Sequence, residues 1–507
     1  MAGKITKVLV ANRGEIALRV MRALRELEIP SVAVYSEADR EAAHVLFANE
    51  AVCIGPAPST ESYLRIDKIL DAVRKTGADA VHPGYGFLSE NSAFARALRD
   101  AGIGFIGPGP EAMEMMGNKL TARAAMIAAG VRVIPGSDGA LGDPQEALRL
   151  SREIGFPVML KAAAGGGGKG MRVVRDESEM ASALEATQAE AAKAFADSAV
   201  FVEKYIEKPR HIEIQVLADR QGNAVYLGER ECSIQRRHQK VVEESPSPIV
   251  DEAMRREMGE MAVMVAKACD YESAGTVEFM VDAHRDFYFL EMNTRLQVEH
   301  PVTELTYNVD LVKLQIAVAG GEALPFRQDE LVPHGWAMEF RIYAEDPATD
   351  FLPSTGKILR LREPGGPGIR HDSGIYEKYD VPIFYDPLLS KLVVYGQTRV
   401  EVIQRARRAF TEFVIAGIRT NIPFHQWLLR QPAFEKGDFD THFIDTHFRP
   451  EYLKQDEALP FVALAAATLA YHQHGRRMNF AGLQAFSRRP SKWKLAARKE
   501  AVTRRQS

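Results

Sequence analysis

The sequence predicts an α/β protein with a Rossmann-like N-terminal domain, a central α/β domain and a more β-rich C-terminal domain. Three observations support this prediction. Short apolar segments alternate with helical patterns over the first hundred or so residues, a glycine-rich loop follows an apolar strand near residue 160, and strand patterns recur beyond Pro333. Alternating strands and helices are typical of βαβ units, which build parallel sheets.

The N-terminal domain is predicted from five short apolar strands: Val8 to Val10, Val32 to Tyr35, Ala51 to Ile54, Ala80 to Val81, and Phe105 to Ile106. After the first strand, apolar residues recur at helical spacing, at Ile16, Val20, Leu24 and Leu27. We expect Pro30 to end this helix, because proline denies the next turn a backbone donor. The preceding turn, residues 12–15, lacks the glycines of GxGxxG, so NAD binding is not predicted.

A length of 507 residues predicts several domains, because single cores stop growing at roughly 250 to 300 residues. The composition changes near Pro135, Pro333 and Pro450. The final residues are strongly basic, which would suit docking to an acidic partner. The predicted parts are a Rossmann-like domain at residues 1–115, a central domain at 116–333 with a lid at about 135–205, a β-rich domain at 334–448 and a basic extension at 449–507.

The composition argues against several classes of partner. A net charge of −4 gives no electrostatic basis for binding nucleic acid or an acidic membrane. No stretch of about 18 apolar residues occurs, so no membrane span is predicted. Cys53, Cys232 and Cys269 lie far apart without CxxC spacing, which argues against a disulfide framework and a structural zinc site. We expect a cytoplasmic protein with no nucleic-acid or membrane partner.

The segment from Thr276 to Asn293 is the most informative about chemistry. Its pattern predicts a β-hairpin with a polar turn centred between residues 284 and 285, so Glu278 should face Glu291 with Cβ atoms about 5 Å apart. Two apposed carboxylates repel each other unless a divalent cation bridges them or they share a proton, and we favour Mg²⁺. Asn293, on the same strand face as Glu291, adds a neutral oxygen ligand. An exposed strand face with scattered acids is the alternative.

Four other stretches add charged or flexible groups, and three of them have an ordinary structural explanation as well. The loop that leaves the hairpin places Arg295 and Glu299 four residues apart. Residues 235–240 include four charged or titratable groups suited to binding phosphate or bicarbonate, although a solvated charge run is the alternative. The glycine-rich loop 165–170 lets backbone amides close over phosphate oxygens, or it is a flexible turn. The loop 82–91 follows a strand where open α/β sheets place ligand loops, or it is a tight connection.

Taken together, five motifs resemble those of biotin carboxylase, a family of ATP-grasp enzymes. They are ANRGEIA from Ala11, HPGYGFLSEN from His82, KAAAGGGGKGM from Lys161, ERECSIQRRHQKVVEE from Glu229 and LEMNTRLQVEHPVTE from Leu290. The resemblance covers roughly residues 4 to 448. It implies an ATP-grasp central domain with a mobile glycine-rich lid, and a ligase that uses ATP and bicarbonate to carboxylate biotin through carboxyphosphate.

The resemblance also implies roles for individual residues. The implied ATP contacts are Lys119, Lys161, Gly167, Gly168, Glu203, Lys204, Tyr205, Ile206, His211, Gln235, His238, Glu278 and Glu291. The implied metal ligands are Glu278, Glu291 and Asn293, the bicarbonate contacts are Lys240, Arg295 and Val298, and the biotin contacts are Arg341, Tyr85 and Gln297. The implied catalytic residues are Arg295, Glu299, Lys240 and Arg341, with Glu299 as the base and Arg341 stabilising the biotin enolate. A structural ion pair of Arg341 with Glu339 or Glu345 is the alternative.

The implied cofactors are ATP, Mg²⁺ (with Mn²⁺ as a substitute) and biotin supplied on a carrier protein. No Ala-Met-Lys-Met biotin-attachment sequence occurs, so we expect a separate biotin carboxyl carrier protein or biotinylated subunit, with a carboxyltransferase subunit beside it. The family also implies a homodimer through the biotin carboxylase domain. The final acceptor, such as acetyl-CoA, propionyl-CoA or pyruvate, is not encoded here. The alternatives are another ATP-grasp carboxylate–amine ligase and a non-catalytic nucleotide sensor.

Overall fold

The structure is a computed structural model that describes residues 4–137, 139–141, 143–163, 170–195, 197–453 and 469. Residues 1–452 form one compact unit and residues 453–507 a second. Gly167, Gly168 and nearly all of the predicted basic extension lie outside the described residues. The elements below therefore belong to the first unit.

The N-terminal part is the predicted parallel sheet, in the strand order β3-β2-β1-β4-β5. Its strands are β1 (Val8–Val10), β2 (Ser31–Ser36), β3 (Glu50–Gly55), β4 (Ala80–His82) and β5 (Gly104–Phe105). Its helices are α1 (Gly14–Glu26), α2 (Ala43–Phe47), α3 (Ile66–Thr76) and α4 (Ser92–Asp100). All five predicted strands are confirmed, and with them the α/β class of this part.

Helix α1 ends earlier than predicted. Its last residue is Glu26, and Leu27 lies beyond the helix with 39% of its surface exposed. Glu28 adopts a left-handed conformation, and the Ile29 N–H donates to the Leu24 carbonyl at 2.8 Å. This backbone cap satisfies the end of the helix. The cap, rather than Pro30, therefore ends the helix.

The predicted lid is a small α/β unit with its own core. Its antiparallel sheet has the order β7-β6-β8, with β6 (Val158–Ala162), β7 (Met171–Val174) and β8 (Val200–Lys204). Two helices, α7 (Pro144–Ile154) and α8 (Met180–Phe195), supply the other half of the core. Helices α5 (Pro110–Gly117) and α6 (Lys119–Ala128) precede this unit in the chain.

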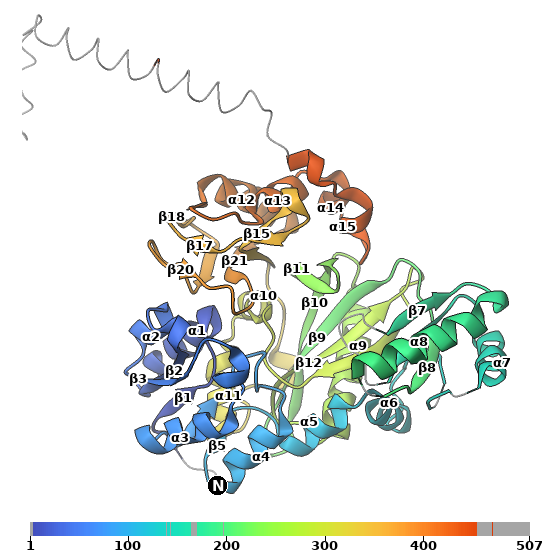
Figure 1. Cartoon of the computed structure of the whole chain (residues 1–507), viewed down its shortest axis with the longest axis horizontal. Coiled ribbons are helices and arrows are strands. Elements are labelled where there is room, and N and C mark those ends of the chain that lie inside the picture. Colours follow the sequence, from blue (N-terminus) through green and yellow to red (C-terminus); the bar gives the residue numbers. More distant parts are fainter. Residues whose placement is uncertain are drawn as a thin grey trace, which may run out of the picture. The chain divides into compact units, whose positions relative to one another are not determined.

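An eight-stranded antiparallel sheet dominates the rest of the unit, in the order β13-β12-β9-β10-β11-β14-β21-β19. Strands β9, β10 and β12 run side by side in Figure 1. The sheet crosses the predicted boundary at residue 333, because β11 pairs with β14 through Val242 and Phe340. Its strands are β9 (Arg210–Ala218), β10 (Ala224–Arg236), β11 (Gln239–Ser245), β12 (Ser273–Val281), β13 (Phe287–Asn293), β14 (Trp336–Tyr343), β19 (Ile369–Ser373) and β21 (Leu388–Gly396).

The two faces of this sheet differ in character. In β9 the residues Ile212 and Ile214 lie in the hydrophobic core, together with residues of α9 (Glu252–Ala268). His211 and Glu213 alternate with them, and successive side chains of a strand point to opposite faces. One face is therefore apolar core and the other carries buried polar groups.

The hairpin of β12 and β13 confirms the predicted pairing of Glu278 with Glu291, but by a different route. Val281 pairs with Phe287, so the turn is centred on residue 284 rather than between 284 and 285. A register shift between Glu278 and Phe279 leaves Leu290 as an extra residue in β13. Such a β-bulge changes the phase of the side chains. The bulge therefore brings Glu291 opposite Glu278.

The C-terminal part contains strands and helices in comparable measure. Helices α12 (Arg399–Glu412) and α13 (Ile422–Leu428) pack on β14, where the ring of Phe340 lies 5.2 Å from that of Phe410. The remaining helices are α10 (His300–Tyr307), α11 (Leu311–Ala319), α14 (Pro432–Lys436) and α15 (Phe443–His447). The remaining strands are β15 (Glu345–Asp346), β16 (Leu352–Pro353), β17 (Gly356–Lys357), β18 (Arg360–Arg362), β20 (Asp380–Val381) and β22 (Val414–Ala416).

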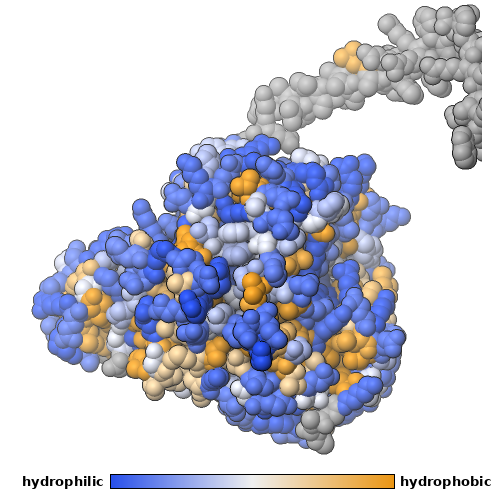
Figure 2. Space-filling view, turned by 180° about the vertical axis from the view of Figure 1, so that it is seen from behind, coloured by the Kyte–Doolittle hydropathy of each residue, from blue (hydrophilic) through white to orange (hydrophobic). Residues whose placement is uncertain are grey.

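The surface seen in Figure 2 is mostly hydrophilic, with apolar residues scattered between polar ones. Most large apolar side chains are buried instead, as Phe279, Phe340 and Leu392 illustrate. Among the described residues, no helix has both the length and the apolar character needed to span a bilayer.

Candidate active site

On the polar face of the eight-stranded sheet, side chains from two strands and from the loop before α10 surround one lysine. Lys240 of β11 has 11% of its side chain exposed, and its Nζ donates to Glu278 Oε1 and Glu299 Oε1, each at 2.8 Å. Nζ also donates to Glu213 of β9. Burial disfavours the charged form, but the carboxylates outweigh burial and raise the pKa of Lys240 well above its usual range. Lys240 is therefore a buried cation shared by three acids.

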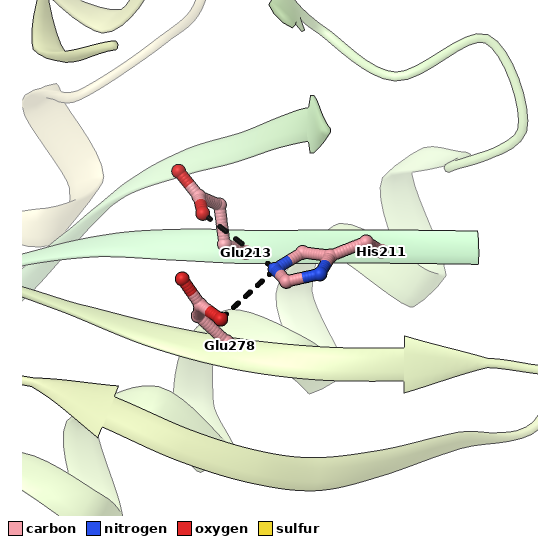
Figure 3. Close-up of side chains that lie close together, drawn as sticks. All are labelled: His211, Glu213 and Glu278. Atoms are coloured by element: carbon pink, nitrogen blue, oxygen red, sulfur yellow. Dashed lines mark ion pairs between the residues drawn. The ribbon is translucent and has the colours of Figure 1, made fainter. Parts of the chain in front are cut away.

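Glu278 is the acid with the most donors in this group. Besides Lys240, its Oε1 accepts from the side-chain amides of Asn293 and Gln297, each at 2.9 Å. His211 Nε2 lies 3.0 Å from the other oxygen (Figure 3). Burial raises the pKa of Glu278, but Lys240 and His211 outweigh burial and hold it well below the usual value. The structure thus compensates the Glu278 charge with Lys240 and His211, which the hairpin pattern alone did not predict.

In the part of the chain that the structure describes, two groups of side chains have the spacing to hold a metal ion, but a protein cation already lies among them. One group is His211, Glu213 and Glu278, drawn in Figure 3, and the other adds Cys232 and Glu299 to Glu213. Lys240 is hydrogen-bonded to each of the three carboxylates involved. An ammonium in this position competes with a metal. Neither group is therefore a metal site of its own.

Glu299 lies between Lys240 and Arg341. Its Oε2 accepts from the Arg341 guanidinium at 2.9 Å, and Arg341 Nε donates to Glu243 at 2.5 Å. Burial raises the pKa of Glu299, but Lys240, Arg341 and Arg230 hold it far below the usual value of a carboxyl. Glu299 is therefore an ionised carboxylate. The partners of Arg341 are Glu243 and Glu299, not the Glu339 or Glu345 of the structural alternative.

A cavity of about 290 Å³, here called the first cavity, adjoins β13. Of the predicted nucleotide and metal residues, it is lined by Lys119, Lys161, Glu203, Glu291 and Asn293. Lys161 Nζ donates to Glu203 at 2.6 Å. Among the described residues, no hydrogen bond or ion pair engages Glu291. Burial and the neighbouring Glu278 raise the pKa of Glu291, so a cation placed beside it would be stabilised.

Glu291 and Asn293, which line the first cavity, fit a magnesium–nucleotide there. Glu291 lacks a direct cationic partner among the described residues and faces Glu278 in the strand register. With the amide oxygen of Asn293 they form an all-oxygen set, which Mg²⁺ prefers together with phosphate oxygens. Burial and Lys161 lower the pKa of Lys119, so an anion in the cavity would stabilise its charged form.

Several other predicted ATP residues lie outside the lining of the first cavity. Lys204 Nζ donates to the backbone carbonyls of Gly155 and Phe156, at 2.8 and 3.2 Å. Gln235 is the next-to-last residue of β10, and His238 lies in the turn between β10 and β11. The residues outside this lining are Lys204, Tyr205, Ile206, His211, Gln235, His238 and Glu278.

A second cavity of about 330 Å³ lies beyond the loop that follows β13. It is lined by Arg295, Val298, Arg341 and Tyr85, which are predicted bicarbonate and biotin residues. The first turn of α1, with Glu15, forms another part of its wall. Thr294 lines the first cavity and Arg295 the second, so the loop separates the two spaces.

The loop between the cavities is held by a residue of the 82–91 motif. Glu90 accepts from the Arg295 guanidinium at 2.8 Å and from the Thr294 N–H at 3.0 Å. Arg295 also donates to Asn293 Oδ1 at 3.1 Å. Two motifs about two hundred residues apart in sequence therefore meet at the site.

Sequence reasoning missed Arg230, which is fully buried and shares the acceptor Glu213 with Lys240. It donates to Glu213 at 2.5 Å, Gln215 at 2.6 Å, Gln297 at 2.8 Å, Thr276 at 2.9 Å and Thr303 at 3.0 Å. A signal was present in the alternation of polar and apolar residues in β9, where His211, Glu213 and Gln215 occupy one face. Gln297 is 3% exposed and does not line the second cavity, so its assignment to biotin stays a prediction.

Comparison with known proteins relates nearly the whole described chain to one family. Residues 4–113 match the family "Biotin carboxylase, N-terminal domain", 118–327 match "Carbamoyl-phosphate synthase L chain, ATP binding domain" and 339–446 match "Biotin carboxylase C-terminal domain". The chain is 55% identical over 443 residues to a biotin carboxylase of Halalkalibacterium halodurans, covering 87% of this chain and 98% of the relative. It is 52% identical over 490 residues to a pyruvate carboxylase subunit of Methanothermobacter thermautotrophicus, covering 93% and 99%.

A solved structure is similar over the same length. It is the biotin carboxylase domain dimer of Hydrogenobacter thermophilus 2-oxoglutarate carboxylase, in complex with MgADP, ADP and bicarbonate. The TM-score is 0.84 at 46% identity, covering 90% of this chain and 100% of that chain.

Proposed function

Because the chain belongs to the biotin carboxylase family, we propose that its two cavities carry out the two stages of ATP-dependent biotin carboxylation. The activity is that of an ATP-dependent ligase. In the first stage bicarbonate and ATP give carboxyphosphate and ADP. In the second stage the carboxyl carbon is transferred to biotin.

We assign MgATP to the first cavity. Glu278, Glu291 and Asn293 would hold the metal ion, with Mn²⁺ as a substitute for Mg²⁺. Lys119 and Lys161 line the same space and would bind phosphate oxygens. When bound, the metal ion would neutralise charge that develops on the transferred phosphoryl group. The other ATP contacts, Gly167 and Gly168 included, and the mobility of the lid stay predictions.

Bicarbonate activation falls to Glu299 in this proposal. A carboxylate bound by two cations is a weak base, and Glu299 is bound by Lys240 and Arg341. Bicarbonate entering beside Arg295 and Val298 would compete for Lys240, and this competition would raise the proton affinity of Glu299. Glu299 then accepts the bicarbonate proton, and a bicarbonate oxygen attacks the γ-phosphorus of ATP with release of ADP.

Carboxyl transfer is assigned to the second cavity. Carboxyphosphate breaks into CO₂ and phosphate, and the phosphate takes the ureido proton of biotin. Arg341 would stabilise the resulting enolate oxygen, because this residue lines the cavity and its guanidinium carries a permanent charge. Tyr85 lines the same cavity and is the predicted biotin contact beside it. The biotin nitrogen then attacks CO₂.

The observation that carries this proposal is the Glu299 carboxylate, which bridges Lys240 at 2.8 Å and Arg341, a residue of the second cavity, at 2.9 Å. The test is ATP hydrolysis by the purified protein with and without bicarbonate and free biotin. We expect hydrolysis to require bicarbonate and to rise further with biotin. An amine-forming ATP-grasp ligase would not respond to biotin, and a nucleotide sensor would bind MgATP without turnover.

The partners and the cellular location of the protein are also proposals. We propose that biotin arrives on a biotin carboxyl carrier protein or a biotinylated subunit, then continues to a carboxyltransferase subunit. The relative from Methanothermobacter thermautotrophicus is one subunit of its carboxylase, which supports this arrangement, and the domain dimer from Hydrogenobacter thermophilus supports a homodimer. A cytoplasmic location is consistent with three free cysteines, Cys53, Cys232 and Cys269.

A further inference from the structure

A fully buried lysine lies behind the wall of the second cavity and has no part in the steps above. Lys391 belongs to β21, has 0% of its surface exposed and does not line either cavity. A lysine that loses all its water is costly to the fold unless other groups compensate its charge. The groups that contact Lys391 therefore indicate which part of the protein needs this charge.

The Lys391 ammonium connects three segments that are far apart in sequence. Its Nζ donates to the Val298 carbonyl oxygen at 2.7 Å and lies 3.3 Å from Glu15 Oε1. The same Glu15 oxygen accepts from the Tyr85 hydroxyl. Val298, Glu15 and Tyr85 all line the second cavity. Each of these wall segments is thus tied, directly or through Glu15, to one cation.

The charges around Lys391 favour its pairing with Glu15. Burial opposes the charge of Lys391, but Glu15, Glu339 and Asp372 outweigh burial and raise its pKa. Asp372 is bound by Arg370 at 2.7 Å. Neither oxygen of Glu339 has a hydrogen-bond partner among the described residues, and burial and Glu243 raise the pKa of Glu339 well above its usual value. Glu15 is the acid that forms an ion pair with Lys391, at 3.3 Å; burial raises the pKa of Glu15, and Lys391 opposes that rise.

We propose that Lys391 is a positioning residue for the second cavity: by holding Val298, Glu15 and Tyr85 together, it sets the space in which bicarbonate and biotin bind. This inference rests on the proposed function of that cavity. Small displacements of groups that orient a substrate cost large factors in rate, so the effect should be kinetic as well as structural.

The first test is Lys391→Met, which keeps much of the side-chain volume and removes the charge. We expect the KM values for bicarbonate and free biotin to rise about tenfold or more, with the KM for MgATP within about twofold. The hydrogen bond and ion pair of Lys391 reach Val298 and Glu15, which do not line the first cavity, so MgATP should be spared. A variant with equal increases in all three KM values, or with none, would overturn the proposal.

The second test separates positioning from stability. Lys391→Met leaves Glu15 as a buried anion without its cation, which destabilises the fold. In the double variant with Glu15→Gln that anion is gone, so thermal stability should be partly restored. The Val298 carbonyl still lacks its donor, so the KM for bicarbonate should remain raised. Restored stability together with normal KM values would mean that Lys391 has only a structural role.

Controls keep this inference distinct from the proposed function. Lys357, with 54% of its side chain exposed, is a matched lysine of the C-terminal part, and Lys357→Met should change neither stability nor any KM value. Stimulation of ATP hydrolysis in the unmodified protein by bicarbonate and biotin is measured first. If the unmodified protein shows no stimulation, both proposals fail. If it shows normal stimulation and the Lys391 variants have unchanged KM values, only the proposed role of Lys391 fails.

Discussion

In the first cavity Glu291 has no hydrogen-bond or ion-pair partner among the described residues, whereas the charged groups around the second cavity bind one another. Glu299 bridges Lys240 and Arg341, and Lys391 pairs with Glu15. A ligand in the first cavity would therefore add missing partners. A ligand in the second cavity must replace partners that are already bound. Binding there therefore exchanges ion pairs within the protein for contacts with the ligand.

The same difference should affect stability. Groups that await a ligand are strained without it, whereas groups that bind one another support the fold. The network of Arg230, Glu213 and Lys240 should therefore stabilise the protein, whereas Lys119 and Glu291 of the first cavity should not. Substitutions in each region can test that contrast.

The largest effect is expected for Arg230→Met. Its removal leaves Glu213 and four other side-chain acceptors without their donor in a fully buried place. We expect a loss of about 3 to 5 kcal/mol in the free energy of unfolding, measured by chemical denaturation. Lys119→Met in the first cavity is the control and should cost less than about 1 kcal/mol. Equal losses in the two variants would contradict the contrast between the cavities.

The next largest effect is expected for Glu299→Gln. The amide cannot accept the bicarbonate proton, so turnover should fall roughly 10²-fold or more. The first cavity is not lined by Glu299, so MgATP binding measured by calorimetry should be unchanged. Turnover near that of the unmodified protein would assign the base to another residue.

A smaller effect is expected for the kinetics of Lys119→Met. Its ammonium lines the first cavity, so the KM for MgATP should rise about tenfold, which corresponds to one charge-assisted contact of about 1.4 kcal/mol. The KM for bicarbonate should stay within about twofold. This pattern is the reverse of that expected for Lys391→Met, and parallel changes in both KM values would show that the cavities are not independent.

The smallest effect is a pH dependence that involves the second cavity. His425 is fully buried, its Nε2 lies 2.9 Å from the carbonyl oxygen of Arg341, and burial lowers its pKa to about 4. Between about pH 6.5 and 4 the unfolded chain binds a proton that the folded chain does not, so stability falls as pH falls. We expect a loss of about 1 kcal/mol between pH 6.5 and 5.5 from this residue.

The check is the free energy of unfolding of His425→Gln across that pH range. Glutamine can still donate to the Arg341 carbonyl but does not titrate, so the variant should show a shallower decline with acid. A decline as steep as that of the unmodified protein would place the pH dependence in other groups, such as the buried His44 and His82, whose pKa values burial lowers to about 4 and about 3.

The sequence by itself determined the elements and the chemistry that each motif contributes. The strand from Val8 to Val10 has the predicted bounds, because apolar periodicity is local information. The pairing of Glu278 with Glu291 was also predicted, but the assumed turn was off by half a residue, and the bulge at Leu290 compensated for that error. A bulge is not visible in the alternation of residue types.

Only the tertiary structure decided which charges meet. Glu15 and Lys391 are 376 positions apart, and Lys240 and Glu299 are 59 positions apart, yet each pair is in contact. Glu15, Arg230 and Lys391 have no local pattern that marks them, since a buried charge is tolerated only through partners that other segments supply. Local sequence specifies strands, helices and reactive groups. The partners of each buried charge depend on how distant segments pack, and that packing exists only in the folded chain.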